Sequence, residues 1–188
     1  MSVATTLVRL NLVTTAIDRV FLLDIPGQQV GGALVEGLAW DGRALWTSIG
    51  SAHGGALFRV DPSSGQITRT LPEPGYDSGQ QVMFDGTDLW LAEGPDDAYR
   101  IDPTSGAVVE HIDLGGGFAI RSCEMWVGDA NSPGGADVFD LATGNPVSTT
   151  SSADGSHLYL GPAVFMGNQL VAVNDMSGIS FFDVTPQP

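Results

Sequence analysis

Acidic and amide side chains recur at one position of a repeated sequence pattern, where their oxygens could bind a hard cation. Each copy of the pattern has an apolar run beginning at a Leu-Trp-type pair, and the residue just past that run is Glu93, Asp129 or Asn174 in three copies. Carboxylate and amide oxygens are the ligands that Ca²⁺ prefers. The hypothesis is a site for Ca²⁺ or another divalent cation, or for a cationic ligand, with these three residues as the metal ligands. Solvated loop acids are the alternative.

Four more residues lie near these positions and complete the candidate site. They are Glu36, His53, Asp96 and Asp175, and we predict that they bind a ligand around the same acidic mouth. The three histidines are not spaced as metal ligands, and the sequence has no nucleophile elbow, phosphate loop or zinc pattern. We therefore assign no catalytic residue.

The candidate positions belong to an internal repeat, which is the strongest signal in the sequence. Residues 37–46 and 81–90 align at an aromatic residue, at Asp-Gly and at Leu-Trp, and weaker copies occupy 117–126 and 162–171. The periodic aromatic positions predict packing between neighbouring repeats. One of them holds Trp46, Trp90 and Trp126, and the other holds Trp40, Phe84, Ile120 and Phe165.

A second motif, Asp-Pro-x-Ser-Gly, follows the first one in each copy. It stands at 61–65 and 102–106, with weaker versions at 138–144 and 181–185. Its residue types favour a turn, because Asp bonds nearby amides, Pro presets φ and Gly accepts a positive φ. An apolar or β-prone stretch follows each turn of the first three copies, which indicates a further strand.

Each repeat therefore predicts four antiparallel strands in about 40 residues, which is the size of a β-propeller blade. We expect an all-β fold, a small β-propeller of four blades, and a β-sandwich is the alternative. The predicted repeat units are 37–74, 81–114, 117–153 and 162–185.

The last unit lacks a fourth strand, and the chain offers one at its other end. We predict that the N-terminal strand 17–26 closes the last blade, that residues 1–16 form an N-terminal arm, and that 17–188 form a single propeller domain. Half of an eight-bladed ring, or an open array completed by a partner, are the alternatives left open.

Charge excludes several classes of function. The net charge is −15, with 22 acidic residues against seven basic ones, all arginine, so nucleic acid and anionic membranes are repelled. The absence of lysine rules out Schiff-base chemistry, and the single cysteine rules out an internal disulfide. We expect no signal peptide or transmembrane segment near the N-terminus. The location stays open between the cytoplasm and an extracellular or virion-type assembly.

The repeats resemble those of several propeller families. Trp40-Asp41-Gly42, Leu45-Trp46 and 59–65, with their copies, are similar to repeats of streptogramin lyases, YVTN-type surface-layer proteins, the gluconolactonase group and glutamine cyclotransferases. The likeness covers most of 17–185 and implies the fold. The stretch 36–41 looks like the opening of a gluconolactonase-type blade, which implies that Glu36 is a divalent-metal ligand. It is also similar to the first blade of glutamine cyclotransferases.

Two functions follow as hypotheses. The first is a non-catalytic binding or structural module for a protein or glycan partner, or for self-association, as part of a larger assembly or surface structure. The rigid frame and loop faces of a propeller suit this role. The second is a small metal-dependent lactonase-, lyase- or cyclotransferase-like enzyme with its acidic site at the propeller mouth.

Overall fold

The structure, a computed structural model, describes most of the chain. The described residues are 3–11, 13–25, 34–50, 55–75, 79–93, 97–114, 117–128, 135–151, 163–166, 168–174 and 178–183. Every regular element in these ranges is a β-strand, and the strands form five sheets. The chain divides into two compact units, Met1–Val82 and Met83–Pro188. Within the described ranges, no helix is long and apolar enough to cross a membrane.

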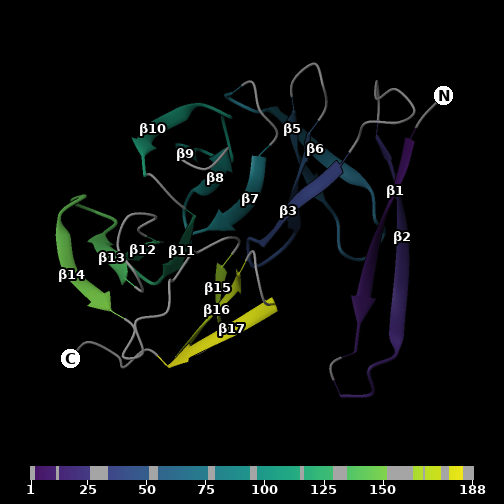
Figure 1. Ribbon diagram of the computed structural model, residues 1–188. Coiled ribbons are helices and arrows are strands. Elements are labelled where there is room, and N and C mark those ends of the chain that lie inside the picture. The colour runs from purple at the N-terminus through teal and green to yellow at the C-terminus, as the bar shows by residue number, and fades with distance from the viewer. Residues whose placement is uncertain are drawn as a thin grey trace. The chain divides into compact units, whose positions relative to one another are not determined.

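The unit Met1–Val82 holds a hairpin and one four-stranded sheet (Figure 1). The hairpin pairs β1 (Val3–Leu10) with β2 (Ile17–Ile25). The sheet runs in chain order through β3 (Leu34–Trp40), β4 (Leu45–Gly50), β5 (Ala56–Val60) and β6 (Ile67–Pro72), each antiparallel to the next. This sheet is the first of the predicted four-stranded blades.

The core of this unit forms because β2 alternates buried and exposed side chains. Leu23 and Ile25 are buried and pack against Ile49, Phe58 and Val60 of the four-stranded sheet. A period of two places such a set of side chains on one face of a strand. The N-terminal segment thus contributes to the core beside the first blade.

The unit Met83–Pro188 holds the remaining sheets, whose strands also follow in chain order (Figure 1). One sheet contains β7 (Gly79–Phe84, which begins before the boundary), β8 (Leu89–Glu93), β9 (Asp97–Ile101) and β10 (Val108–Asp113). The next contains β11 (Phe118–Arg121), β12 (Glu124–Gly128), β13 (Gly135–Asp140) and β14 (Pro146–Ser151). The last has three described strands, β15 (Ala163–Met166), β16 (Gln169–Asn174) and β17 (Gly178–Asp183).

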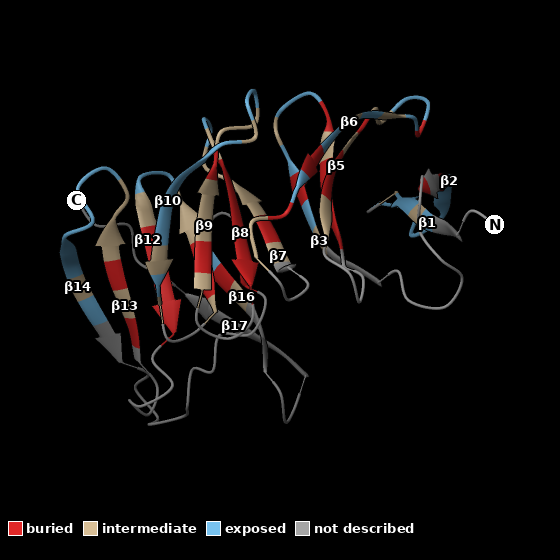
Figure 2. Cartoon of the chain, turned by 90° about the horizontal axis from the view of Figure 1, so that it is seen from above, coloured by how far each residue is buried: buried red, intermediate tan, exposed pale blue. Residues whose placement is uncertain are grey.

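Burial in this unit falls from the middle strands to the outer ones. Figure 2 shows β8 and β12 mostly in red, whereas β10 and β14 carry mostly exposed residues. Tryptophans of the second strands pack edge-on against an aromatic residue of the next sheet. The ring centroids of Trp90 and Phe118 lie 6.2 Å apart, and those of Trp126 and Phe165 lie 5.6 Å apart. The predicted packing of periodic aromatics is confirmed for these two pairs.

One periodic aromatic residue differs from the expectation. Trp40 was expected to be packed like Phe165, but its side chain is 51% exposed. It lies at the end of β3, an edge strand of its sheet, outside the described apolar cluster of its unit. Sequence periodicity assigns Trp40 to a repeat position, but the burial of that position depends on a neighbouring sheet.

The predicted repeat units correspond to the sheets, whereas the closure of the ring stays a prediction. Residues 3–10 of the predicted N-terminal arm form β1, which is hydrogen-bonded to β2. The described neighbour of β17 in its sheet is β16. Pairing of 17–26 with the last blade would join the two units.

A strained hairpin in the third blade offers a test of its backbone. Ser122 has a φ of +55° between β11 and β12, a conformation that residues other than Gly rarely adopt. The first two blades carry Gly42 and Gly86, with φ of +89° and +104°, in the corresponding hairpin turns. We expect Ser122→Gly to raise the free energy of unfolding by about 0.5–1 kcal/mol, because it removes left-handed strain. Urea unfolding measures the change.

Cys123→Gly is the matched control. Cys123 lies in the same turn without a positive φ, so glycine there adds unfolded-state entropy and relieves no strain. This control should lower the stability. A loss of stability in Ser122→Gly would contradict the assignment of strain to that residue.

Candidate functional site

One of the seven predicted site residues has a described side chain. Glu93 ends β8 and is 5% exposed. Glu36 and Asn174 lie in β3 and β16, but their side chains are outside the described residues. His53, Asp96, Asp129 and Asp175 also lie outside the described residues. Convergence of these residues at one mouth therefore stays a prediction.

Glu93 belongs to a row of acidic residues across the second blade. It stands opposite Asp97 on β9, which stands opposite Asp113 on β10. Directly opposite residues share a face of the sheet, and like charges in this arrangement destabilise it. In the described part of the chain, no group of three or more His, Cys, Asp or Glu residues is arranged to hold a metal ion.

A histidine contacts one acid of this row, and a tyrosine stacks on the histidine. His111 Nε2 lies 2.6 Å from Asp97 Oδ1, and the His111 ring stacks on Tyr99 with centroids 4.5 Å apart. Burial raises the pKa of Tyr99, and the negative charges of Asp97 and Glu93 raise it further. The acidic row thus acts electrostatically on its neighbours without forming a described metal centre.

The carboxylate of the Asp-Gly turn holds a tryptophan in the first blade. Asp41 Oδ2 accepts hydrogen bonds from Trp46 Nε1 at 2.9 Å and from Arg59 Nε at 3.2 Å. Burial raises the pKa of Asp41, but the amides of Ala44 and Arg43, with Trp46 and Arg59, bring it below the ordinary value of 3.8. Trp46 and Arg59 are direct cross-strand partners on β4 and β5, which explains why both reach one carboxylate.

The second blade repeats this arrangement with one carboxylate more. Asp85 Oδ2 accepts from Trp90 Nε1 at 2.8 Å, and Arg100, the cross-strand partner of Trp90, donates through Nε to Asp88 at 2.7 Å. The Arg100 guanidinium also lies 5.7 Å from the centroid of the Trp90 ring. Burial lowers the pKa of Arg100, but Asp88, Asp85 and Glu110 more than offset it and raise the value.

The third blade keeps the contact although it lacks the Asp-Gly turn. Glu124 Oε2 accepts from Trp126 Nε1 at 3.0 Å and from Arg121 Nη2 at 2.9 Å. The residue opposite Trp126 is Val138, so the arginine comes from the neighbouring strand β11 instead. This carboxylate–indole–arginine contact was not predicted from the sequence. In the first two blades the contact could have been found from an Asp five residues before the tryptophan of each Leu-Trp pair and an Arg two residues before the Asp of each Asp-Pro pair.

The Asp-Pro-x-Ser-Gly turns form as predicted. Asp61 Oδ1 accepts from the amide of Ser63 at 2.7 Å and from its hydroxyl at 2.6 Å. The weaker copy at Asp140 forms a similar turn without proline. Its Oδ1 accepts from the amide and hydroxyl of Thr143, both at 2.8 Å. The hydroxyl and then the amide of Ser63 lower the pKa of Asp61 to about 2. These carboxylates are charged and belong to the framework.

A recess of about 360 Å³ lies between the sheets β7–β10 and β11–β14 and is the candidate binding site. We call it the inter-blade groove. Trp90, Met125 and Val127 form its floor, and each is almost fully buried. Because sheets twist, the outer strands of neighbouring blades diverge and leave space between them, whereas the inner strands pack closely. The described lining of the groove comes from β8, β10, β12 and β13 and from residues that follow β10 and β13.

Apolar side chains that are only partly buried line the walls of the groove. Ile112 and Leu114 come from β10 and the residue after it, and Phe139 and Leu141 come from β13 and the residue after it. All four pack against the apolar cluster that contains Trp90. They also line the recess, so the blade core is continuous with the surface of the groove.

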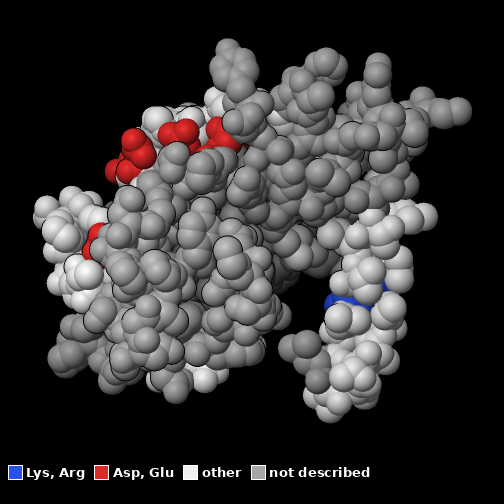
Figure 3. Space-filling view, viewed as in Figure 1, with Lys and Arg blue, Asp and Glu red and all other residues white. Residues whose placement is uncertain are grey.

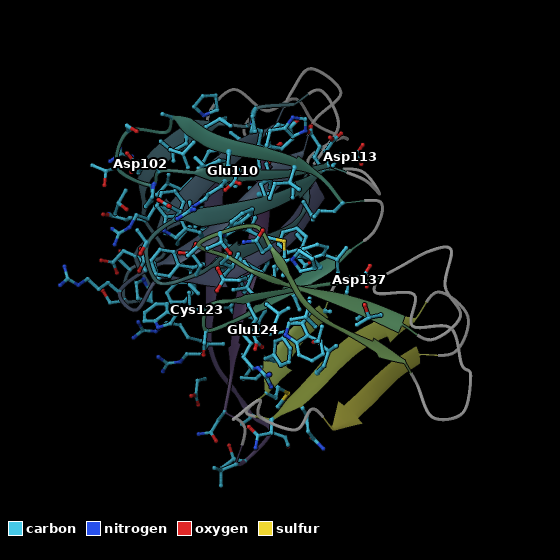
Figure 4. The ribbon with its side chains drawn as sticks, turned by 90° about the vertical axis from the view of Figure 1, so that its left-hand side faces the viewer. Asp102, Glu110, Asp113, Cys123, Glu124 and Asp137 are labelled. Carbon is cyan, nitrogen blue, oxygen red and sulfur yellow. The ribbon has the colours of Figure 1, made fainter. Side chains whose placement is uncertain are left out.

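The rim of the groove is acidic. Among its described lining residues are four carboxylates, Glu110 and Asp113 on β10 and Asp137 and Asp140 on β13, and none of those residues is basic. Figure 4 shows Asp113 and Asp137 at the same end of the two blades, and Figure 3 shows acidic side chains gathered over β10. A partner that enters the groove meets hydrophobic surface surrounded by negative charge.

Solved structures establish the fold. The chain is similar to the glutaminyl cyclase of Myxococcus xanthus, with a TM-score of 0.61 and 17% identity over 96% of this chain and 83% of that one. It is also similar to the Cps50 (Swd1) β-propeller domain of Myceliophteria thermophila, with a TM-score of 0.61 and 17% identity over 95% and 58% of the chains. A computationally designed protein, Ika4, aligns with a TM-score of 0.56 and 16% identity over 87% and 97%.

The chain therefore has the β-propeller fold that the repeats predict. At these identities the similarity carries the fold alone, and one fold serves many functions. No protein-family model and no curated protein matches the sequence.

The indole contact predicts a stability difference between two tryptophans. Trp90→Phe removes the donor to Asp85, whose carboxylate is only 8% exposed, and shrinks a packed side chain. We expect the free energy of unfolding to fall by about 1–3 kcal/mol, because a buried acceptor loses its partner. Trp40→Phe is the control and should change it by less than about 0.5 kcal/mol, since Trp40 is half exposed. Equal losses in urea unfolding would contradict this role of the indole.

The turn carboxylates predict a loss of stability in acid. A folded-state pKa of about 2 for Asp61, below the ordinary 3.8, means that its contribution is present above pH 3.8 and is lost as pH falls toward 2. The lowered pKa values of Asp102 and Asp140 act in the same direction. We expect the melting temperature of the wild type to fall through this window.

Asp61→Asn should show a smaller fall across the same pH range, because the amide does not titrate there. Asp18→Asn removes a charge from a surface ion pair with Arg9 at 3.7 Å and serves as the control, with the full fall retained. If both variants follow the wild-type curve, Asp61 does not contribute through its lowered pKa.

Proposed function

We propose that this chain is a non-catalytic propeller module that binds a protein partner, as a component of a larger assembly. The inter-blade groove is the observation that carries the proposal. An apolar centre surrounded by a polar rim is the usual anatomy of a protein-binding surface. The apolar walls favour a peptide side chain over a glycan, because buried glycan hydroxyls would need hydrogen-bond partners.

The roles of the described carboxylates support the same proposal. Asp41, Asp85 and Glu124 hold tryptophans, and Asp61 and Asp140 shape turns. These groups build a rigid frame, which is what a binding surface needs to stay preorganised. The net charge of −15 disfavours a second copy of the chain as the partner and favours a basic one.

A metal-dependent enzyme is the second candidate. The burial of Glu93 at the end of β8 favours it, as does the similarity to a glutaminyl cyclase at 17% identity. This candidate requires Glu93, Asp129 and Asn174 to share a divalent cation. It predicts that Ca²⁺ raises the melting temperature of the wild type but not that of Glu93→Gln. Our proposal predicts no Ca²⁺-dependent shift in either protein.

Selection from a random peptide library tests the proposed function directly. The folded chain is immobilised, and an unrelated acidic protein of similar net charge serves as the control target. We expect peptides that are enriched on the chain and not on the control, because a shaped surface selects for more than opposite charge. The proposal fails if the same peptides are enriched on both targets or none is enriched on the chain.

A further inference from the structure

We infer that the inter-blade groove binds a short basic segment of a protein through one bulky apolar side chain, with Arg or Lys residues on either side of it. The inference rests on the proposed function and names the chemistry of the partner. Its three supports are the size of the groove, the charge of its rim and the surroundings of the rim carboxylates.

The size of the groove fits one anchor residue. Its volume of about 360 Å³ lies at the lower end of the range of about 300–1,000 Å³ for ligand sites. Trp90, Met125 and Val127 close it from below, while Ile112 and Phe139 flank the opening. A Leu, Ile, Met or Phe side chain would contact apolar atoms on all of these sides. Such anchors in desolvated pockets dominate the affinity of protein interfaces.

The charge of the rim selects the neighbours of that anchor. Its described carboxylates are Glu110, Asp113, Asp137 and Asp140. None of the described lining residues is basic, and Glu110 is paired with Arg100 of the neighbouring strand. An acidic segment would be repelled, as would another copy of a chain whose net charge is −15. Arg or Lys residues one or two positions from the anchor would place their charges near the rim.

Two rim carboxylates are especially suited to accept a cation. Asp113 is exposed at the end of the edge strand β10, next to the groove wall residue Ile112, where a positive charge of a partner can approach it. Asp140 stays negatively charged because the hydroxyl and then the amide of Thr143 lower its pKa. Asp140 also accepts from Thr143 within its own turn, and the other two have partners within the blades, since Glu110 lies 3.6 Å from Arg100 and Asp137 accepts from Thr149 at 2.9 Å.

The experiment uses three labelled synthetic peptides and fluorescence anisotropy. The first has a central leucine flanked by arginines, the second replaces the leucine by serine, and the third replaces the arginines by glutamates. We expect the first to bind roughly tenfold more tightly than the second, the effect of one buried apolar anchor. The third should not bind. Added salt should weaken the first peptide but preserve its advantage over the second.

Groove variants of the full chain locate the binding. The double variant Glu110→Gln and Asp113→Asn should weaken the arginine–leucine peptide by about threefold to tenfold. Leu141→Ala should weaken it without changing the effect of salt, and its melting temperature shows whether it folds. Asp18→Asn, which removes one exposed charge outside the groove, should leave the affinity unchanged. Where Leu141→Ala does not fold, the exposed double variant decides.

The outcomes separate this inference from the proposed function. Equal binding of the leucine and serine peptides, or equal losses in Asp18→Asn and in the double variant, would indicate general charge attraction and overturn the inference. If the random library yields specific peptides that lack basic residues or bind the double variant normally, the proposed function stands and only the inference fails. If the library yields none, the proposed function fails as well.

Discussion

The hydrogen bond from a tryptophan indole to a hairpin carboxylate is the contact on which each of the first three blades depends. Asp85 accepts this bond from Trp90, and the bond fixes the indole at the sheet surface. The same ring then packs edge-on against Phe118 of the next blade and forms part of the floor of the inter-blade groove. The chain of contacts thus runs from a turn residue through the core to the surface proposed for binding.

The third blade keeps the hydrogen bond between a carboxylate and the tryptophan indole, although the carboxylate comes from a different sequence position. Its hairpin has Arg121 and Ser122 where the first two blades have Asp-Gly, so the usual carboxylate is missing. Glu124 replaces it from a place two residues before Trp126, and Arg121 replaces the cross-strand arginine. A longer acidic side chain can reach the indole from the strand itself. The blade retains its packing against Phe165, although its hairpin includes a residue with a strained positive φ.

Local interactions explain what the sequence could predict. The strands and turns follow from alternation, from Asp-Pro and from glycines with positive φ, all of which act within a few residues. The exposure of Trp40 could not be predicted, because it depends on what faces β3. The groove could not be predicted either, because the partial burial of Phe139 and Leu141 depends on how two sheets pack and not on the local sequence. The acidic mouth was predicted from residues near strand ends and in loops, and of these the structure describes the Glu93 side chain.

The use of arginine alone as the basic residue accounts for the charge of the surface. Arg100 and Arg121 each pair with a carboxylate and lie over a tryptophan ring, which the planar guanidinium can do at once and the lysine ammonium cannot. Arg59 pairs with Asp41 in the same place of the first blade. Each of these positive charges lies against carboxylates of its own blade, with Glu110 of β10 among them, and the seven arginines leave most of the 22 acidic residues unbalanced. Excess negative charge therefore remains at surfaces such as the groove rim, where a basic partner would balance it.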